Sequence, residues 1–135
     1  MAVFAATDFT VSVNAVDLTD HCNSVTTDFS VADLETTAFG DTWTTRIGGL
    51  KSGNVSLNFH QDFAASNVDS TLWDAFGTVV EVILKPTSGA TSATNPSYTF
   101  DVLVTQVQPI AASVGDVAVQ SVSWPVTDAV TRATS

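Results

Sequence analysis

The most constraining feature of this sequence is a strict alternation of apolar and polar residues between positions 54 and 60. The apolar set is Val55, Leu57 and Phe59. Alternation with a period of two is typical of a strand that has one face in a core and the other in water. Residues 9–15 and 25–31 repeat the pattern. The sequence therefore predicts strands in all three segments.

Composition supports an all-β fold. Ser and Thr make up about a quarter of the chain, whereas Lys and Glu occur only twice each. Val, Thr and aromatic residues favour pleated, half-buried strands, and the polar residues that favour helices are scarce. A length of 135 residues fits a single domain, so we expect one β domain over residues 1–135.

One helix is predicted, over residues 67–76. Its apolar face would contain Val68, Leu72, Trp73 and Phe76. Gly77 would end it, because glycine readily adopts the left-handed conformation at a helix terminus. Residues 31–39 are a weaker candidate for a helical turn, since Thr36 and Thr37 disfavour helix.

Glycine-rich and polar segments predict the connections between strands. Residues 47–53 contain three glycines and are predicted to form the tip of a hairpin that spans residues 43–59. Residues 39–53 and 86–95 are accordingly expected to be long exposed loops.

Further strands are predicted in the second half of the chain. Residues 79–85 are apolar on nearly both faces, which is typical of a central strand covered on each side. Alternating residues at 98–104 and 122–126 predict a hairpin, with its turn at 114–116.

The charge balance excludes one class of function. Fourteen Asp and Glu residues against four Lys and Arg residues give a net charge of -10. Tight phosphate binding is therefore not expected, because it needs clustered cations. Cys22 is the only cysteine, so no internal disulfide can form. We also expect no leader peptide and no membrane span.

The chain shows no familiar catalytic or cofactor motif, and we expect neither an enzyme nor a cofactor. His60 and Asp62 could form a base and its orienting carboxylate, but a solvated or interface histidine at a strand end explains the pattern better. His21 could activate the thiol of the adjacent Cys22. A cysteine that is simply packed into the fold explains the sequence better. The aspartates match no calcium-loop spacing, so no metal site is predicted.

A few side chains are candidates for contacts with other molecules. Trp73 and Trp124 lie in amphipathic patterns and are expected in the core, whereas Trp43 is expected to be partly exposed. An exposed tryptophan can stack on a sugar ring or lie in a protein interface. Arg46 and Lys51 flank one predicted loop. They either pair with carboxylates of a neighbouring protein molecule or are ordinary surface charges.

The order of several short motifs resembles a known family. The motifs are Thr37–Trp43, Ile47–Gly53, Phe59–Asp62, Leu72–Trp73, Phe76–Thr78, Ser92–Tyr98, Val114–Asp116 and Ser121–Val126. In this order they resemble the tail tube proteins of long-tailed, siphophage-type bacteriophages. The resemblance spans roughly residues 10–132, and its specificity lies in the order of the motifs.

The resemblance implies a β-sandwich or barrel with one flanking helix, which assembles into hexameric rings that stack as a hollow tube. It makes the loops at residues 39–53 and 86–95 candidates for ring-to-ring contacts. The candidate residues for contacts between subunits are Trp43, Arg46, Leu50, Lys51 and Lys85. Strands of successive subunits would close an inner barrel, and double-stranded DNA would pass through it without specific binding. It also implies tape-measure, tail-terminator and baseplate or tail-tip partners, and assembly in the host bacterial cytoplasm into a virion. An acidic wall would repel phosphate and so let DNA slide.

Two other functions remain open from the sequence. Another virion protein, such as a tail terminator, a connector or a capsid decoration protein, would share the motif order. A monomeric carbohydrate-binding β-sandwich would use Trp43 and its polar neighbours.

Overall fold

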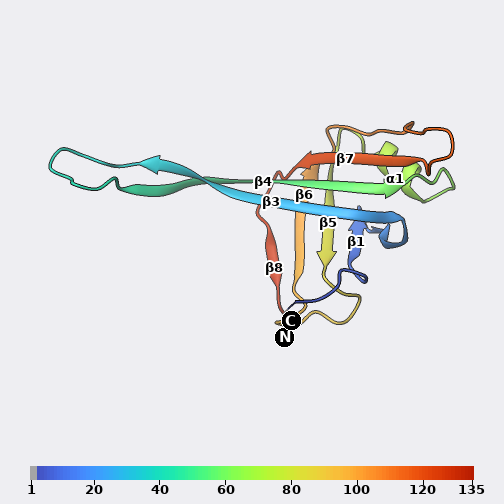
Figure 1. The fold of residues 1–135 in the computed structure, drawn as a ribbon, viewed down its shortest axis with the longest axis horizontal. Helices are drawn as coiled ribbons and strands as arrows, with labels where there is room; N and C mark the ends of the chain where they lie inside the picture. Colours follow the sequence, from blue (N-terminus) through green and yellow to red (C-terminus); the bar gives the residue numbers. More distant parts are fainter. Residues whose placement is uncertain (1–2) are drawn as a thin grey trace.

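The protein folds into two antiparallel β-sheets and one short helix, as seen in a computed structural model that describes residues 3–135 (Figure 1). The larger sheet has the order β2 (Val16–Asp17), β1 (Thr10–Val13), β5 (Val79–Lys85), β6 (Ser97–Leu103) and β8 (Thr131–Ala133). The smaller sheet has the order β3 (Cys22–Glu35), β4 (Arg46–His60) and β7 (Val119–Pro125). The helices are η1 (Thr19–His21), a 3-10 turn, and α1 (Val68–Ala75). The all-β prediction is confirmed.

The two sheets pack face to face, and their strands run across one another (Figure 1). Alternate side chains of each strand enter the space between them, and Val55, Leu57 and Phe59 do so as predicted. The core they share includes Val11, Val13, Val82, Leu84, Phe100, Val102, Val122 and Trp124. The period-two pattern at residues 54–60 therefore identified the buried face of β4 correctly.

The predicted position of the first hairpin tip was wrong. Residues 47–53 continue the strand β4, and the connection between β3 and β4 is the segment 36–45. The glycines of 47–53 do not take positive φ angles; they make room for side chains of β3. Residues 31–35 extend β3, so the alternative of a helical turn there was also wrong.

The predicted second hairpin is also absent from the described chain. β6 lies in the larger sheet and β7 in the smaller one, and only an isolated bridge between Val102 and Val126 joins their ends. Gly115 does form the expected turn, with φ +87°. That turn belongs to a longer crossover between the sheets, which local periodicity does not distinguish from a hairpin.

β5 is central in its sheet but is covered on one face only. Val80, Val82 and Leu84 are buried, whereas Val79 and Glu81 are exposed. The prediction of a strand covered on both sides was therefore wrong. No layer of the described chain packs on the outer face of the larger sheet, so its apolar residues there remain in contact with solvent.

The helix forms where predicted, and Gly77 follows it with φ +82°. Val68, Leu72 and Ala75 bury their side chains against the core. Trp73, however, is 57% exposed and stacks on Phe76, with ring centroids 5.9 Å apart. The expectation that Trp73 lies in the core was wrong, whereas Trp124 is fully buried as expected.

Candidate assembly surface

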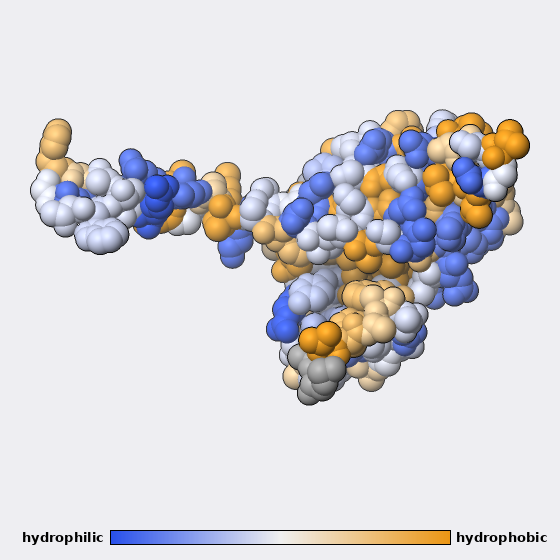
Figure 2. Space-filling model, in the orientation of Figure 1, coloured by the Kyte–Doolittle hydropathy of each residue, from blue (hydrophilic) through white to orange (hydrophobic). Residues whose placement is uncertain are grey.

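A long hairpin extends β3 and β4 far beyond the body of the protein (Figure 1). We call residues 31–51 the arm. Every residue of the arm is exposed except the half-buried Gly49. Figure 2 shows the arm standing clear of the compact body, with apolar and polar side chains both facing solvent. A hairpin of this length buries almost nothing of its own, so its exposed apolar side chains are free to meet another molecule.

The two faces of the arm differ in chemistry. On one face Arg46 lies opposite Glu35, and its Nη1 donates a hydrogen bond of 2.7 Å to Asp33 Oδ2. On the other face Leu34 lies opposite Ile47, and both are about half exposed. Because side chains alternate between faces, the charged and apolar residues are separated. The arm is thus an amphipathic ribbon.

A bulge interrupts the ladder in the middle of the arm. Gly49 and Leu50 of β4 together oppose the single residue Ala32 of β3, because the register shifts between Val31 and Asp33. A Cβ on Gly49 would lie 3.0 Å from Leu34 Cδ1, so glycine permits this close approach. Bulges of this kind bend and twist a ribbon. The bulge leaves Leu50 88% exposed at the edge of the apolar face.

The tip of the arm is a defined turn. Ala38 N donates to Asp41 Oδ2 at 2.8 Å, and Asp41 N donates to the Ala38 carbonyl at 3.1 Å. Gly40 occupies the turn with φ +92°, a conformation that other residues rarely adopt. The turn presents Phe39, fully exposed, and Trp43, 85% exposed.

The arm brings together four of the five predicted contact residues. Trp43 lies in the connecting loop, and Arg46, Leu50 and Lys51 lie in β4. Lys85 lies apart in the larger sheet, where its Nζ donates to the Gly89 carbonyl at 2.9 Å. The sequence analysis missed the exposed apolar residues Leu34, Ile47 and Phe39. For Leu34 and Ile47, the available signal was that the alternating pattern of a strand continues past position 31.

A groove of about 750 Å³ lies where the arm leaves the body. Phe29, Val31 and Lys51 form one wall, and residues 126–130 form the other. Phe29 reaches inward from this wall and packs edge-on against Phe100, with ring centroids 5.8 Å apart. The groove extends the exposed apolar surface from the arm to the body.

The outer edge of β3 is open. In residues 3–135, β3 pairs with β4 on one side and with no strand on the other, over a length of 14 residues. By contrast, the segment after β6 covers the outer edge of β7. There Ala111 accepts a hydrogen bond from Val119 N, and Gln108 Oε1 accepts one from Ser121 N. An open edge of this length is a template for pairing with another chain.

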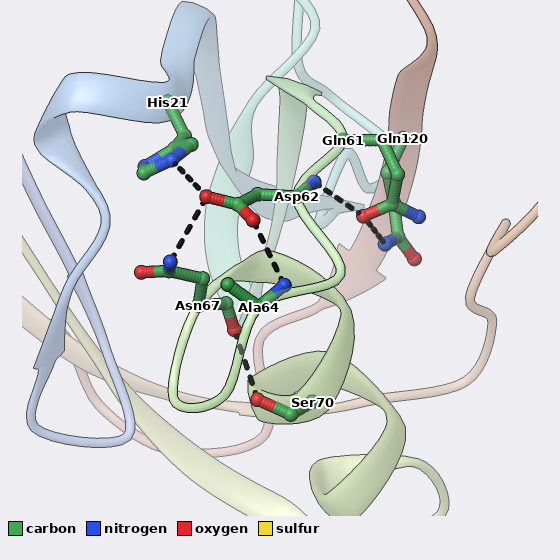
Figure 3. A network of polar contacts seen from close by, with 7 residues as sticks. All are labelled: His21, Gln61, Asp62, Ala64, Asn67, Ser70 and Gln120. Carbon is green, nitrogen blue, oxygen red and sulfur yellow. Dashed lines mark hydrogen bonds and ion pairs between the residues drawn. The ribbon is translucent and has the colours of Figure 1, made fainter.

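His60 and Asp62 do not pair, in line with the preference for a histidine without a catalytic role. Asp62 Oδ2 lies 2.8 Å from His21 Nε2 and accepts a second hydrogen bond from Asn67 Nδ2 at 2.9 Å (Figure 3). Asp62 Oδ1 accepts one from Ala64 N at 2.9 Å. These contacts, with the Ala64 amide contributing most, hold the pKa of Asp62 below its ordinary value. The cluster ties η1 to the loop that enters α1, which is a structural role.

The remaining catalytic and metal hypotheses gain no support from the geometry. Burial raises the pKa of the Cys22 thiol, the opposite of the shift that activates a nucleophile. Over residues 3–135, no group of three or more His, Cys, Asp or Glu side chains is placed to hold a metal ion. Within the same range, no helix has the length and hydropathy needed to cross a membrane.

Sequence comparisons place the chain in no family. No protein-family model matches it, and no curated protein matches it.

Solved structures, by contrast, share its fold. A chain in the virion of a native gene transfer agent particle superposes with a TM-score of 0.78 at 16% identity, covering 98% of this chain and 100% of that one. A chain in the tail of an empty gene transfer agent particle, refined with helical and C6 symmetry, superposes with a TM-score of 0.66 at 16% identity. This match covers 84% of this chain and 83% of that one. A chain in the six-fold symmetrised baseplate of the anti-feeding prophage superposes with a TM-score of 0.55 at 10% identity. This match covers 99% of this chain and 98% of that one. The protein therefore has the fold of chains that occur in phage-tail-like particles.

Proposed function

We propose that this protein is a structural subunit of a phage-type tail, which self-assembles into stacked, hexameric rings forming a hollow tube for double-stranded DNA. The observation that carries the proposal is the arm, in which every residue except Gly49 is exposed, the apolar ones included. The arm stands on a fold that covers 98% of this chain in its match to a chain of a gene transfer agent virion. The arm contributes almost nothing to the core of the monomer, and its exposed apolar side chains support a role in contacts with other subunits.

The surfaces described above fit two kinds of contact. The open edge of β3 suits pairing with a neighbour in the same ring, where strand addition removes the exposed edge. The arm suits a contact between rings, because it projects away from the body, and its apolar face would be covered there. Repeated head-to-tail contacts of this type generate open-ended filaments.

The contact residues predicted from the sequence take specific places in this proposal. Leu50 and Trp43 would supply apolar area at the contact between rings, and Arg46 and Lys51 would pair with carboxylates at its rim. Lys85 lies outside the arm and would contribute to a different contact. The tape-measure, terminator and baseplate proteins of a tail would meet the same ring surfaces at the ends of a stack.

A second candidate is a subunit of a single terminal or connecting ring. The likeness to a chain in a baseplate favours it. Such a subunit would form rings that do not stack on themselves.

Negative-stain electron microscopy over a concentration series, combined with light scattering, tests both candidates. Tubes whose length grows with concentration are the result expected for a tail tube. Single rings that never stack would indicate the terminal or connecting role. Particles that remain monomeric at every concentration, even with preformed tail tips added, would contradict both.

A further inference from the structure

The outer face of the larger sheet carries an apolar pair of residues that nothing in residues 3–135 covers. Val79 of β5 lies directly opposite Leu103 of β6, and both side chains are exposed. The neighbouring residues Val80 and Val102 are buried in the core, so the apolar pair points away from it. Exposed aliphatic side chains that lie together on one face are typical of a surface that meets another molecule.

Two aromatic side chains extend this surface onto the helix. Trp73 and Phe76 are both exposed, and their ring centroids lie 5.9 Å apart. Gly77 N donates to the Val104 carbonyl at 2.9 Å, and Val104 N donates to the Thr78 carbonyl at 3.0 Å. These two bonds hold the end of α1 beside the ends of β5 and β6. We call the four exposed residues Trp73, Phe76, Val79 and Leu103 the apolar patch.

A pair of carboxylates lies next to the apolar patch. Glu81 of β5 is directly opposite Asp101 of β6, on the same outer face and two positions along from the apolar pair. Like charges that oppose one another across an antiparallel pair destabilise it. Within residues 3–135 neither carboxylate forms an ion pair. The apolar patch therefore has an acidic side whose charge is not compensated.

The cations of the described chain lie away from this face. Arg46 and Lys51 lie in the arm, and Arg132 lies in β8, opposite Tyr98 at the far end of β6. Lys85 is on β5, but four positions from the acidic pair, which is about 13 Å along a strand. Exposed charges at such a distance are largely screened at physiological salt. Positive charge at the acidic pair must therefore come from another molecule.

A second copy of this chain is poorly suited to the face. Each copy has a net charge of -10 and only four Lys and Arg residues. Bringing another copy to the acidic pair places acidic surface against acidic surface. The contacts proposed for assembly also use other surfaces, because the open edge of β3 and the arm both belong to the smaller sheet. The face therefore suits a different molecule that carries positive charge.

We infer that the apolar patch, with Glu81 and Asp101 beside it, binds a different protein through a segment in which apolar side chains are flanked by lysine or arginine. The apolar side chains of this segment cover the patch, and a flanking cation bridges the two carboxylates. Burial of the aromatic and aliphatic groups supplies most of the affinity, and the charges orient the partner and speed its association. One subunit carries the whole face, so binding needs no assembly.

Isothermal titration calorimetry with synthetic peptides tests the inference. The first peptide alternates leucine with lysine, and the second replaces every leucine with serine at unchanged charge. The proteins titrated are wild type, Val79→Ser with Leu103→Ser, Glu81→Gln with Asp101→Asn, and Asp20→Asn with Asp28→Asn. The last variant is the matched control, because it removes the same charge from exposed residues of η1 and β3.

Wild type should bind the leucine and lysine peptide, and less tightly as salt rises. Both variants of the face should bind it at least about tenfold more weakly. The control variant should change the affinity by less than about twofold. The serine and lysine peptide should bind wild type at least about tenfold more weakly than the first peptide.

Three results would overturn the inference. Equal losses in the control and in Glu81→Gln with Asp101→Asn would show a general attraction of a basic peptide to an acidic protein. Equal affinities of the two peptides for wild type would remove the apolar patch from the binding site. Absence of binding by the leucine and lysine peptide would show that the face does not take such a segment.

Light scattering tests the alternative that another copy covers the face. Wild type and Val79→Ser with Leu103→Ser should have the same mass at every concentration. A lower mass for the variant would assign the face to self-association and overturn the inference. These measurements do not require tubes, so they test the face separately from the proposed function.

Discussion

Phe29 lies directly opposite Gly53 in the ladder between β3 and β4, and its ring occupies the space that a side chain on residue 53 would need. A Cβ built on Gly53 would stand 2.5 Å from Phe29 Cδ1 and 3.2 Å from Val126 Cγ2. The same phenylalanine packs against Phe100 of the other sheet. The glycine therefore allows the hairpin to leave the body while its root remains anchored to the core.

The substitution Gly53→Ala should push Phe29 off Phe100 and lower the free energy of unfolding by about 1–3 kcal/mol, as overpacking typically does. Chemical denaturation measures the change. Gly89→Ala is the matched control, because its new Cβ would meet Thr87 Oγ1 at 3.5 Å and Asn95 Nδ2 at 3.9 Å, both ordinary contacts, and its φ is not positive. Equal stability of the two variants would contradict the proposed anchoring.

The tryptophans provide a second test, because their environments differ. Trp124 is fully buried, and its Nε1 donates to the Gln106 carbonyl at 2.9 Å. Trp124→Phe removes this hydrogen bond and leaves a void, so we expect a loss of about 1–3 kcal/mol in the free energy of unfolding. Trp73→Phe should change it by less than about 0.5 kcal/mol, since Trp73 is largely exposed. Thermal unfolding of both variants would show the contrast, and similar losses would refute it.

The arm should matter for assembly and not for folding. Ile47→Ser combined with Leu50→Ser removes apolar area from residues that are exposed in the monomer. We expect the free energy of unfolding to change by less than about 0.5 kcal/mol and the critical concentration for assembly to rise. Val117→Ser, which is also exposed but lies in a loop of the body, is the control and should assemble normally. Normal assembly of the arm variant would remove the arm from the proposed interface.

Asp62 should make stability depend on pH in the acidic range. Its contacts with the Ala64 amide and His21 lower its pKa in the folded protein below the ordinary 3.8. A carboxyl whose folded pKa is depressed contributes stability above its unfolded pKa, and this contribution is lost as pH falls through the folded pKa. Wild type should therefore exceed Asp62→Asn in melting temperature at pH 6, and the difference should shrink below about pH 4.

Asp74→Asn provides the comparison for that series, because Asp74 is exposed on α1. The melting temperature of Asp74→Asn should stay close to that of wild type at every pH. If the melting temperatures of wild type and Asp62→Asn differ by the same amount at pH 6 and at low pH, the carboxylate charge contributes nothing to stability.

Side-chain periodicity alone sets the local structure of the β4 core face and of α1. Strict alternation at residues 54–60 requires one buried face, and the spacing of Val68 and Leu72 followed by Gly77 requires a helix that ends there. These are properties of side-chain periodicity, which any tertiary arrangement must satisfy. The all-β class follows from the same periodicity together with the scarcity of helix-forming residues.

Only the tertiary structure decided the rest. The glycines at 48, 49 and 53 look like a turn in sequence, but their role depends on the side chains that the paired strand β3 places against them. The predicted pairing of residues 98–104 with 122–126 failed because each segment found a better partner in a different sheet. Asp62 bonds to His21, 41 positions away, which no local pattern reveals. Pairing between strands is a choice among distant partners, so the arm and the open edge appear only when the chain is folded.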